Sequence, residues 1–136
     1  MDESVIRRKV AEARVARVGT LDERGSVHLV PVVYVVDGDT WYSPSDPGSR
    51  PVKRLRNVLA DPRATILIDD YDEVWSRVWW VRLRGQGRMV ESAAESERAR
   101  RLLAAKYPQF GGDAEASTAG PVMAIDIQEW AGWSYS

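Results

Sequence analysis

The stretch VARVGTLDERGSVHLVPVVYVVDGDTWYS, residues 15–43, decides the fold. Three runs rich in β-branched and aromatic residues predict strands at 15–21, 26–36 and 40–43. The connections DERG and DGD carry the aspartate and glycine that are typical of hairpin turns. We therefore expect an antiparallel meander in this part of the chain.

The flanking sequence adds helices and further strands. Ser4 is the expected N-cap of a short helix over residues 5–14. After the meander the pattern predicts a helix at 51–60, strands at 64–69 and 77–90, a helix at 92–107 opened by the Ser92 and Glu95 capping box, and a last strand at 121–130. Six or so strands with few helices predict a mainly β single domain over residues 1–136, a small barrel with flanking helices.

Composition excludes several classes of function. The chain has 136 residues and a formal net charge of −1, so it lacks the basic field that nucleic-acid binding needs. It has no cysteine and a single histidine, His28, which argues against a thiolate or multi-histidine metal site. No apolar run approaches the ~20 residues of a membrane span, and the N-terminal residues lack a signal-peptide core. We expect a cytoplasmic protein that binds neither membrane nor nucleic acid and holds no metal.

Positive charge is concentrated at the start of the helix predicted at 51–60. Pro51 suits its first position. Helical spacing predicts a buried face of Val52, Leu55, Val58 and Leu59, and an outer face of Lys53, Arg54, Arg56 and Asn57. Cations in a first turn are unfavourable because the helix N-terminus is itself partly positive, so this placement predicts a bound phosphate or carboxylate. The alternative is an ordinary solvated helix face partnered by Asp61 or Asp46, and the spacing does not decide between the two.

These segments together resemble a known family. The order of VHLVPVVYVVDGDTWYS, the basic KRLRN segment and DPRATILID is similar to that of the split β-barrel flavin and deazaflavin reductases, the superfamily of pyridoxamine-phosphate oxidase. Within it the sequence resembles most the branch that uses the deazaflavin coenzyme F420. The resemblance covers residues 15–133 and is most specific at Arg54, Arg56, Asn57 and 61–64. It implies a split β-barrel and a homodimer with two cofactor sites at the subunit interface.

The resemblance also assigns site residues. The phosphate-bearing tail of the cofactor would meet Ser43, Lys53, Arg54, Arg56 and Asn57, with Ser49 and Arg50 in reach. The tricyclic ring would lie along the strand backbone at Val30, Pro31 and Val32. Trp79 or Trp80 of the partner subunit would cover the ring; the two side chains point to opposite faces of one strand, so at most one of them can do so.

Two departures from the family pattern narrow the function. The chain lacks the arginine-containing strand motif and the basic, histidine-containing C-terminal motif of the pyridoxamine-phosphate oxidases, so vitamin B6 oxidation is not expected. The usual lysine of the deazaflavin branch is replaced by Arg54, with Lys53 beside it. This exchange preserves charge but changes contact geometry, because arginine is a rigid fork and lysine a point charge.

No nucleophile and base pair emerges from the sequence, which leaves the catalytic residues unidentified. That absence is compatible with a cofactor enzyme, because there the cofactor supplies the reactive chemistry. The resemblance implies an F420-dependent oxidoreductase that transfers hydride between the coenzyme and an unidentified small organic acceptor. The alternatives are an FMN-dependent oxidoreductase of the same fold and an F420-binding protein without turnover. We expect His28 to be structural or at the surface, and Trp41, Trp130 and Trp133 to pack in the core or an interface.

Overall fold

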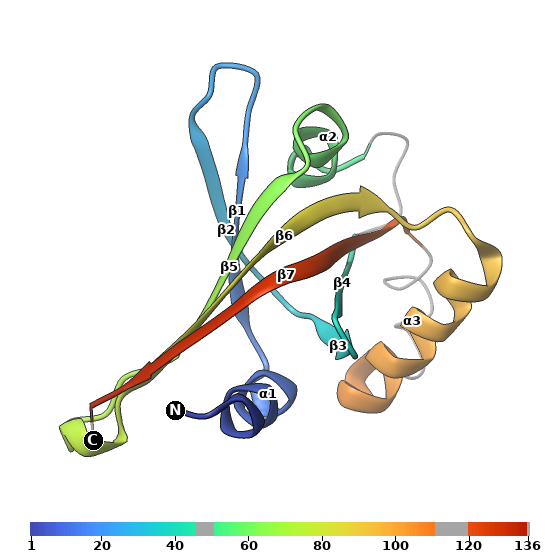
Figure 1. Cartoon of the computed structure of the whole chain (residues 1–136). Helices are drawn as coiled ribbons and strands as arrows, with labels where there is room; N and C mark the ends of the chain where they lie inside the picture. Colours follow the sequence, from blue (N-terminus) through green and yellow to red (C-terminus); the bar gives the residue numbers. More distant parts are fainter. Residues whose placement is uncertain (46–50, 111–119, 136) are drawn as a thin grey trace.

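A computed structural model describes residues 1–45, 51–110 and 120–135. It contains one antiparallel seven-stranded sheet in the order β2-β1-β5-β6-β7-β4-β3, with helices at separate places around it (Figure 1). The elements in chain order are α1 (Glu3–Glu12), β1 (Ala16–Leu21), β2 (Val27–Val32), β3 (Val35–Asp37), β4 (Thr40–Pro44), α2 (Lys53–Ala60), β5 (Arg63–Asp70), the 3-10 turn η1 (Trp75–Arg77), β6 (Trp79–Met89), α3 (Ala93–Lys106), the 3-10 turn η2 (Pro108–Phe110) and β7 (Val122–Ser134).

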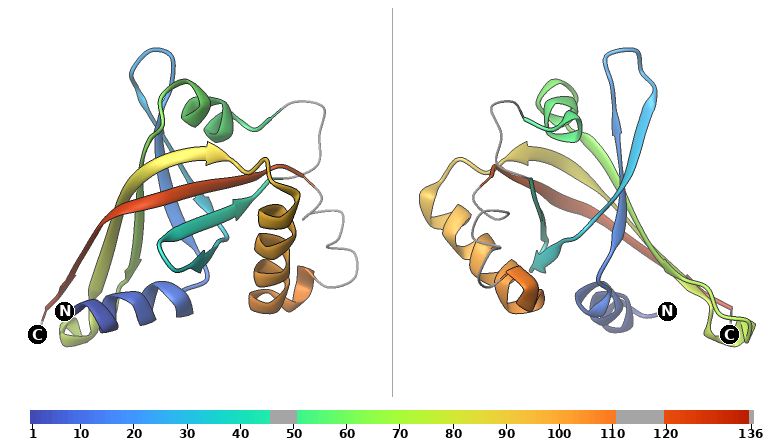
Figure 2. Two further views of the ribbon diagram at one scale, coloured as in Figure 1. Left: turned by 45° about the vertical axis from the view of Figure 1, so that its right-hand side comes forward. Right: turned by 180° about the vertical axis from the view of Figure 1, so that it is seen from behind.

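The inner face of the sheet closes around one main core. Strands β1, β4, β5, β6 and β7 each contribute buried side chains to this cluster, with Trp41 of β4 stacked on Tyr34 at 5.7 Å between ring centroids. Helix α1 adds Ile6 and Val10, and α2 adds Leu55. The two helices close opposite ends of the curled sheet, as both views in Figure 2 show. This half-barrel with helices at its ends confirms the predicted split β-barrel class.

Helix α3 packs outside the half-barrel, on β3, β4 and β7. A second buried cluster joins it to these strands through Val35, Tyr42, Ala99, Leu103, Tyr107, Val122 and Ala124. The predicted N-cap is confirmed, because the Ser92 hydroxyl accepts a hydrogen bond from the Glu95 N–H at 3.3 Å. The Glu95 side chain, however, does not complete the capping box.

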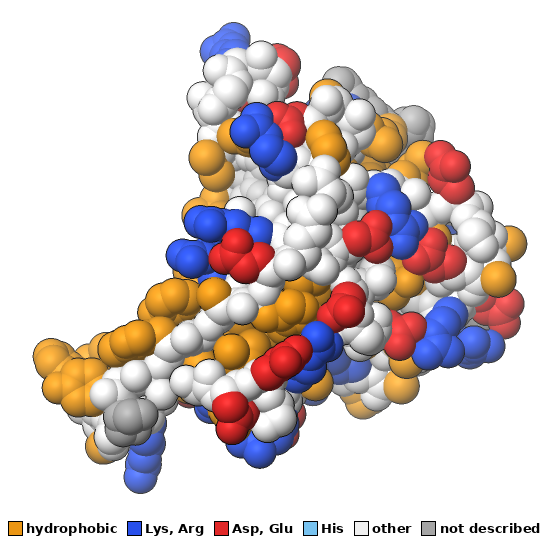
Figure 3. All heavy atoms as spheres, viewed as in Figure 1, with side chains coloured by type: hydrophobic (Ala, Val, Ile, Leu, Met, Phe, Trp, Pro, Cys, Tyr) orange, Lys and Arg blue, Asp and Glu red, His pale blue; other side chains and the backbone are white. Residues whose placement is uncertain are grey.

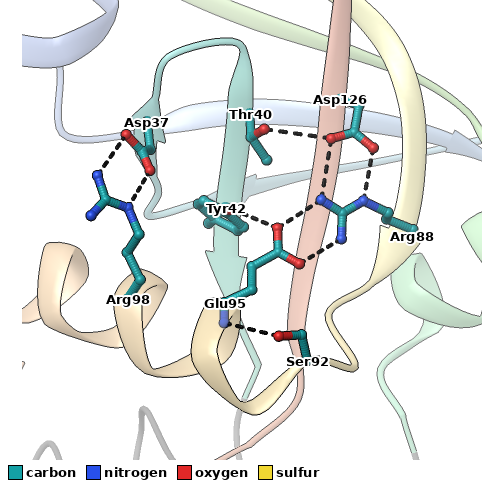
Figure 4. Close-up of polar contacts among 8 residues, drawn as sticks. All are labelled: Asp37, Thr40, Tyr42, Arg88, Ser92, Glu95, Arg98 and Asp126. Carbon is teal, nitrogen blue, oxygen red and sulfur yellow. Dashed lines mark hydrogen bonds and ion pairs between the residues drawn. The ribbon is translucent and has the colours of Figure 1, made fainter.

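Instead, the Glu95 carboxylate belongs to a polar cluster that binds α3 to the sheet (Figure 4). Arg88 of β6 donates to both Glu95 oxygens at 2.8 and 2.7 Å, and to Asp126 of β7 at 2.7 and 3.2 Å. The Tyr42 hydroxyl donates to Glu95 at 2.7 Å. Arg98, one turn further along α3, donates to Asp37 of β3 at 2.6 and 3.2 Å.

The long strands β5, β6 and β7 continue past the barrel as an arm that ends at η1 and the C-terminal residues (Figure 1). Trp75 and Tyr135 lie at this end with exposed fractions of 58% and 57%, and their rings meet edge to face at 5.9 Å. Figure 3 shows hydrophobic side chains gathered along the arm. Aromatic residues are more frequent in protein–protein interfaces than on the rest of a protein surface, so the arm is a candidate interface.

The structure corrects several predicted boundaries. Asp2, not Ser4, caps α1, and its carboxylate accepts from the Val5 N–H. The strand predicted at 26–36 is two strands, β2 and β3, because the chain turns at 33–34 to leave one edge of the sheet and join the other. Helix α2 begins at Lys53 and does not include Pro51. The last strand runs on to Ser134.

No helix in the described ranges is long and apolar enough to cross a membrane.

Candidate functional site

The first turn of α2 carries positive charge and no acid of its own. The helix begins at Lys53, and its N-cap residue, Val52, offers no side-chain hydrogen bond. Lys53, Arg54 and Arg56 follow, and the turn has no acidic residue. The partial positive charge of the backbone N–H groups and the three cations therefore add at one place, which is favourable toward an anion.

Both arginines of this turn reach backbone carbonyls near the helix start. Arg54 is half-buried and donates from Nη2 to the carbonyl of Pro44, the last residue of β4, at 3.1 Å. Arg56 donates from Nη1 to the carbonyl of Pro51 at 2.5 Å. A guanidinium has five N–H donors in a planar fork, so a carbonyl contact and a phosphate contact are compatible. These contacts fix the direction of the two side chains.

Lys53 lies toward the β1–β2 hairpin. Its Nζ is 3.8 Å from Asp22 Oδ2, and the lysine side chain stays 43% exposed. Asp22 accepts hydrogen bonds from the N–H groups of Ser26 and Arg24. These two bonds, that of Ser26 first, hold the pKa of Asp22 below its usual value, with Lys53 as a smaller cause. The alternative predicted from sequence was a helix face partnered by Asp61 or Asp46. Asp61 forms an ion pair with Arg63 at 2.7 Å instead, and Asp46 lies outside the described residues.

Asn57 differs from its predicted position on the outer face. It is only 5% exposed, and its Nδ2 donates to the Thr20 hydroxyl at 3.0 Å. Thr20 is paired in register with His28 of β2, so His28 lies beside Thr20 on the same face of the sheet. The prediction is also wrong for Leu59 on the same helix: its spacing predicts a buried side chain, and the side chain is 55% exposed.

His28 was expected to be structural or at the surface, and the structure makes it a site candidate. It is half-buried, and its Nδ1 is shielded from solvent with no hydrogen-bond partner in the part of the chain that the structure describes. Strand alternation puts it on the same face as Val30, two residues further along β2. That alternation is a sequence signal that could have linked His28 to the predicted ring-binding stretch.

Two serines lie where β4 ends near α2. Ser43 is 1% exposed, and its hydroxyl donates to the carbonyl of Val33 at 2.9 Å, which ties β4 to the β2–β3 connection. Ser45 is 3% exposed, and its hydroxyl has no hydrogen-bond partner among the residues that the structure describes. It follows Pro44, the residue that accepts from Arg54. An unsatisfied buried hydroxyl costs about 1–3 kcal/mol, and a ligand oxygen here would remove that cost.

These residues fit the phosphate-bearing tail of a flavin-type cofactor. Phosphate oxygens accept hydrogen bonds, and the site offers cationic side chains, helix N–H groups and the Ser45 hydroxyl. Ser43, Lys53 and Arg54 are brought to the same end of the half-barrel. Ser49 and Arg50, the other two predicted phosphate contacts, lie outside the described residues.

The predicted ring contacts lie on β2, an edge strand of the sheet. Val32 is 8% exposed, Val30 is half-buried against the core, and Pro31 points outward. One side of an edge strand has no strand partner, so its backbone groups can bind a ligand. The placement of a ring at Val30, Pro31 and Val32 remains a prediction.

The two candidate lid tryptophans, Trp79 and Trp80, lie far from α2 within one chain. They begin β6 near η1, whereas α2 lies at the other end of the sheet (Figure 1). Trp79 packs against the main core, with Lys9 Nζ 4.6 Å from its ring centroid. Trp80 is on the other face of β6, beside Arg82, whose Cζ is 5.4 Å from the Trp80 centroid. Trp80 is therefore the better lid candidate, and only a second copy of the chain could bring it to α2.

Across the described part of the chain, no three histidine, aspartate or glutamate side chains are close enough together to bind a metal ion.

The fold defines a class, the split-barrel proteins. The chain matches the sequence model of the pyridoxamine 5'-phosphate oxidase family over residues 3–134, so it belongs to that family. No curated protein matches the chain in sequence.

Solved structures have the same fold. The conserved hypothetical protein Rv2991 from Mycobacterium tuberculosis superposes with a TM-score of 0.82 at 20% identity, covering 98% of this chain and 85% of that protein. A FAD-binding protein from Mesorhizobium loti gives 0.73 at 18% identity, covering 97% of this chain and 94% of that one. The FAD-binding protein from Mycobacterium smegmatis gives 0.69 at 18% identity, covering 100% and 98%. At these identities the likeness shows the fold.

Proposed function

We propose that the protein is an F420-dependent oxidoreductase that transfers hydride between this deazaflavin and a small organic acceptor, working as a homodimer. The observation that carries the proposal is the first turn of α2, where three cations follow a helix start without a side-chain cap, near the buried Ser45 hydroxyl, which has no partner within the described ranges. Two proteins of similar fold bind FAD. Family membership and these neighbours support a flavin-type cofactor in general, and the choice of F420 is the finer step.

The chain's own residues have binding and positioning roles in this proposal. Lys53, Arg54 and Arg56 would hold the anionic tail, with Ser45 donating to one of its oxygens. The edge of β2 would support the ring, and Trp80 of the partner subunit would exclude water from its open face. When bound, the coenzyme supplies the hydride chemistry itself, so the protein needs no nucleophile.

F420 is preferred over FMN for two reasons. The strand arginine that grips the FMN phosphate in the oxidases is missing from this chain. F420 has a longer anionic tail, and the cations Lys53, Arg54 and Arg56 can contact more of it than of FMN. One or two extra ionic contacts of about 0.5–1 kcal/mol each at partly exposed positions predict about tenfold tighter binding of F420.

The test is a titration of the purified protein with F420 and with FMN, followed by ligand fluorescence at low and physiological salt. We expect F420 to bind about tenfold more tightly, with the difference shrinking as salt rises. FMN that co-purifies in stoichiometric amount, or binds more tightly, would replace F420 with the FMN alternative. Oxidation of reduced F420 on addition of an acceptor separates an enzyme from a binding protein without turnover.

A further inference from the structure

A hollow of about 370 Å³ lies along the arm, between the ends of β5 and β6. Its walls are mostly apolar and aromatic, with the guanidinium of Arg82 and the carboxylates of Asp69 and Asp70 as the charged groups; the other lining residues are Leu67, Tyr71, Val78, Trp79 and Trp80. Flat aromatic walls favour a flat ligand, because rings stack on one another at small cost in side-chain freedom. The shape and lining therefore point to a planar molecule.

Arg82 is the unusual residue of this hollow. Within the described part of the chain it makes no hydrogen bond and no ion pair, and its Nε is shielded from solvent without a partner. Its neighbours in register on the two adjoining strands are Leu67 and Ala131, which carry no charge. Its guanidinium lies near the face of Trp80. A permanent cation with a shielded Nε–H on a mostly apolar surface is satisfied best by an anion.

The nearby carboxylates do not neutralise Arg82. Asp69 is engaged by Arg17, whose Nη1 lies 2.8 Å from Asp69 Oδ1. Asp70 follows on the other side of β5, where its register partner is Trp79. Both carboxylates border the hollow, and neither reaches ion-pair distance of Arg82. A ligand carboxylate would therefore be the partner that the chain itself does not provide.

We propose that this hollow binds planar aromatic carboxylates, with the ring against Trp80 and the carboxylate on Arg82. This rests on the proposed function in one respect: in the homodimer such a molecule would be the hydride acceptor, lying between Trp80 and the open face of the cofactor ring held by the other protomer. In that reaction a C–H bond of the reduced deazaflavin breaks and one forms on the acceptor, which gains two electrons, and water supplies the accompanying proton. The guanidinium then also stabilises negative charge that develops on the conjugated acceptor.

The test uses 2-naphthoate and its neutral counterpart 2-naphthamide, titrated by calorimetry into the purified full-length protein without cofactor. We expect naphthoate to bind about tenfold more tightly than naphthamide, because only the carboxylate makes a charge-assisted contact. Arg82→Gln should remove this preference, and Arg82→Lys should retain part of it. Arg84→Gln is the matched control: it lies two residues further on the same face of β6, pairs with Glu129 at 3.9 Å and does not line the hollow.

The proposal is overturned if naphthoate does not saturate the protein, or if Arg82→Gln keeps the preference while its circular dichroism matches that of wild type. It is also overturned if Arg84→Gln loses the preference as fully as Arg82→Gln. Asp70→Asn gives an independent check, because removal of a like charge at the rim should strengthen naphthoate binding and leave naphthamide unchanged. The titration contains no F420, so its result is separate from the outcome of the cofactor titration.

Discussion

Glu95 joins three elements through one carboxylate. Two hydrogen bonds from Arg88, and a smaller effect of the one from Tyr42, lower the pKa of Glu95 from 4.5 to about 2. The folded pKa lies below the unfolded value, so the contribution of this carboxylate to stability is fully present above pH 4.5 and is lost as the pH falls toward 2. The cluster in Figure 4 is thus a source of acid sensitivity.

We expect Glu95→Gln to lower the free energy of unfolding at pH 7 by about 1–2 kcal/mol, because Arg88 loses its ionic contact on α3 but keeps Asp126. The difference from wild type should vanish as the pH approaches 2. Urea unfolding at pH 7 and at several values below 4.5 measures both effects. Glu97→Gln on the same helix is the control: its pair with Arg101 is exposed, and the change should stay within about 0.5 kcal/mol. Equal losses for the two variants would contradict the role of Glu95.

Two side chains of α2, Asn57 and Leu59, lie on the opposite faces from those predicted by sequence. Hydrophobic spacing placed Leu59 inside and Asn57 outside, and the structure has them reversed. A polar side chain can be buried when it finds a partner, and the partner here is Thr20, which is 37 positions away along the chain. Hydrophobic periodicity has no information on such a distant hydrogen bond. The orphaned Nδ1 of His28 and hydroxyl of Ser45 are equally invisible in sequence.

At the scale of elements, α2 lies close to β6 because Gly87 has no side chain. A Cβ built on Gly87 would lie 2.6 Å from Val58 Cγ1 and 2.7 Å from Val58 Cβ, well inside contact distance. The N–H of Gly87 also donates to the carbonyl of Pro62, just after the helix, at 2.6 Å. The position of the basic first turn therefore depends on a glycine that is distant from it in sequence.

We expect Gly87→Ala to lower the free energy of unfolding by about 1–3 kcal/mol, because the methyl group forces Val58 away from β6. The double variant Gly87→Ala, Val58→Ala should cost less than the sum of the two single changes, since it removes the contact with Val58 Cγ1 and leaves only the one with Val58 Cβ. Gly19→Ala is the control, because a Cβ there meets its nearest atom at an ordinary 3.5 Å. Chemical denaturation of the four variants measures the coupling, and strict additivity would rule out the clash.

Most elements were predictable from sequence because their patterns are local. The two hairpin turns are confirmed, with positive φ at Gly25 and Gly38, and so is the N-cap of α3 at Ser92. The sheet order was not predictable in this way. After β2 the chain leaves one edge of the sheet, and β3 forms the other edge. Strand β4 pairs with β7, which is remote from it in the chain. Such pairings form when the barrel closes, and the spacing of apolar residues within one segment does not reveal them.

At the scale of the whole molecule, the predicted site is divided. The cations of α2 are at one end of the half-barrel, and Trp80 is at the other, on an arm that carries exposed aromatic side chains (Figures 1 and 3). One chain cannot bring these groups together. A homodimer in which the arm of one protomer reaches the α2 end of its partner would complete two equivalent sites, as expected for a twofold interface. The proposed cofactor site would therefore be shared between the two protomers.

Complementation between two defective protomers tests this most directly. Arg54→Ala alone should weaken F420 binding about ten- to a hundredfold through loss of contact with the tail, and Trp80→Ala alone should weaken it by loss of the cover over the ring. The mixed dimer, co-expressed with two different affinity tags and purified on both, has one site with both defects and one with neither. We predict that this mixed dimer binds F420 at one of its two sites with wild-type affinity. A mixed dimer that binds as weakly as its parents, or a protein that light scattering finds monomeric at micromolar concentration, would contradict the shared site.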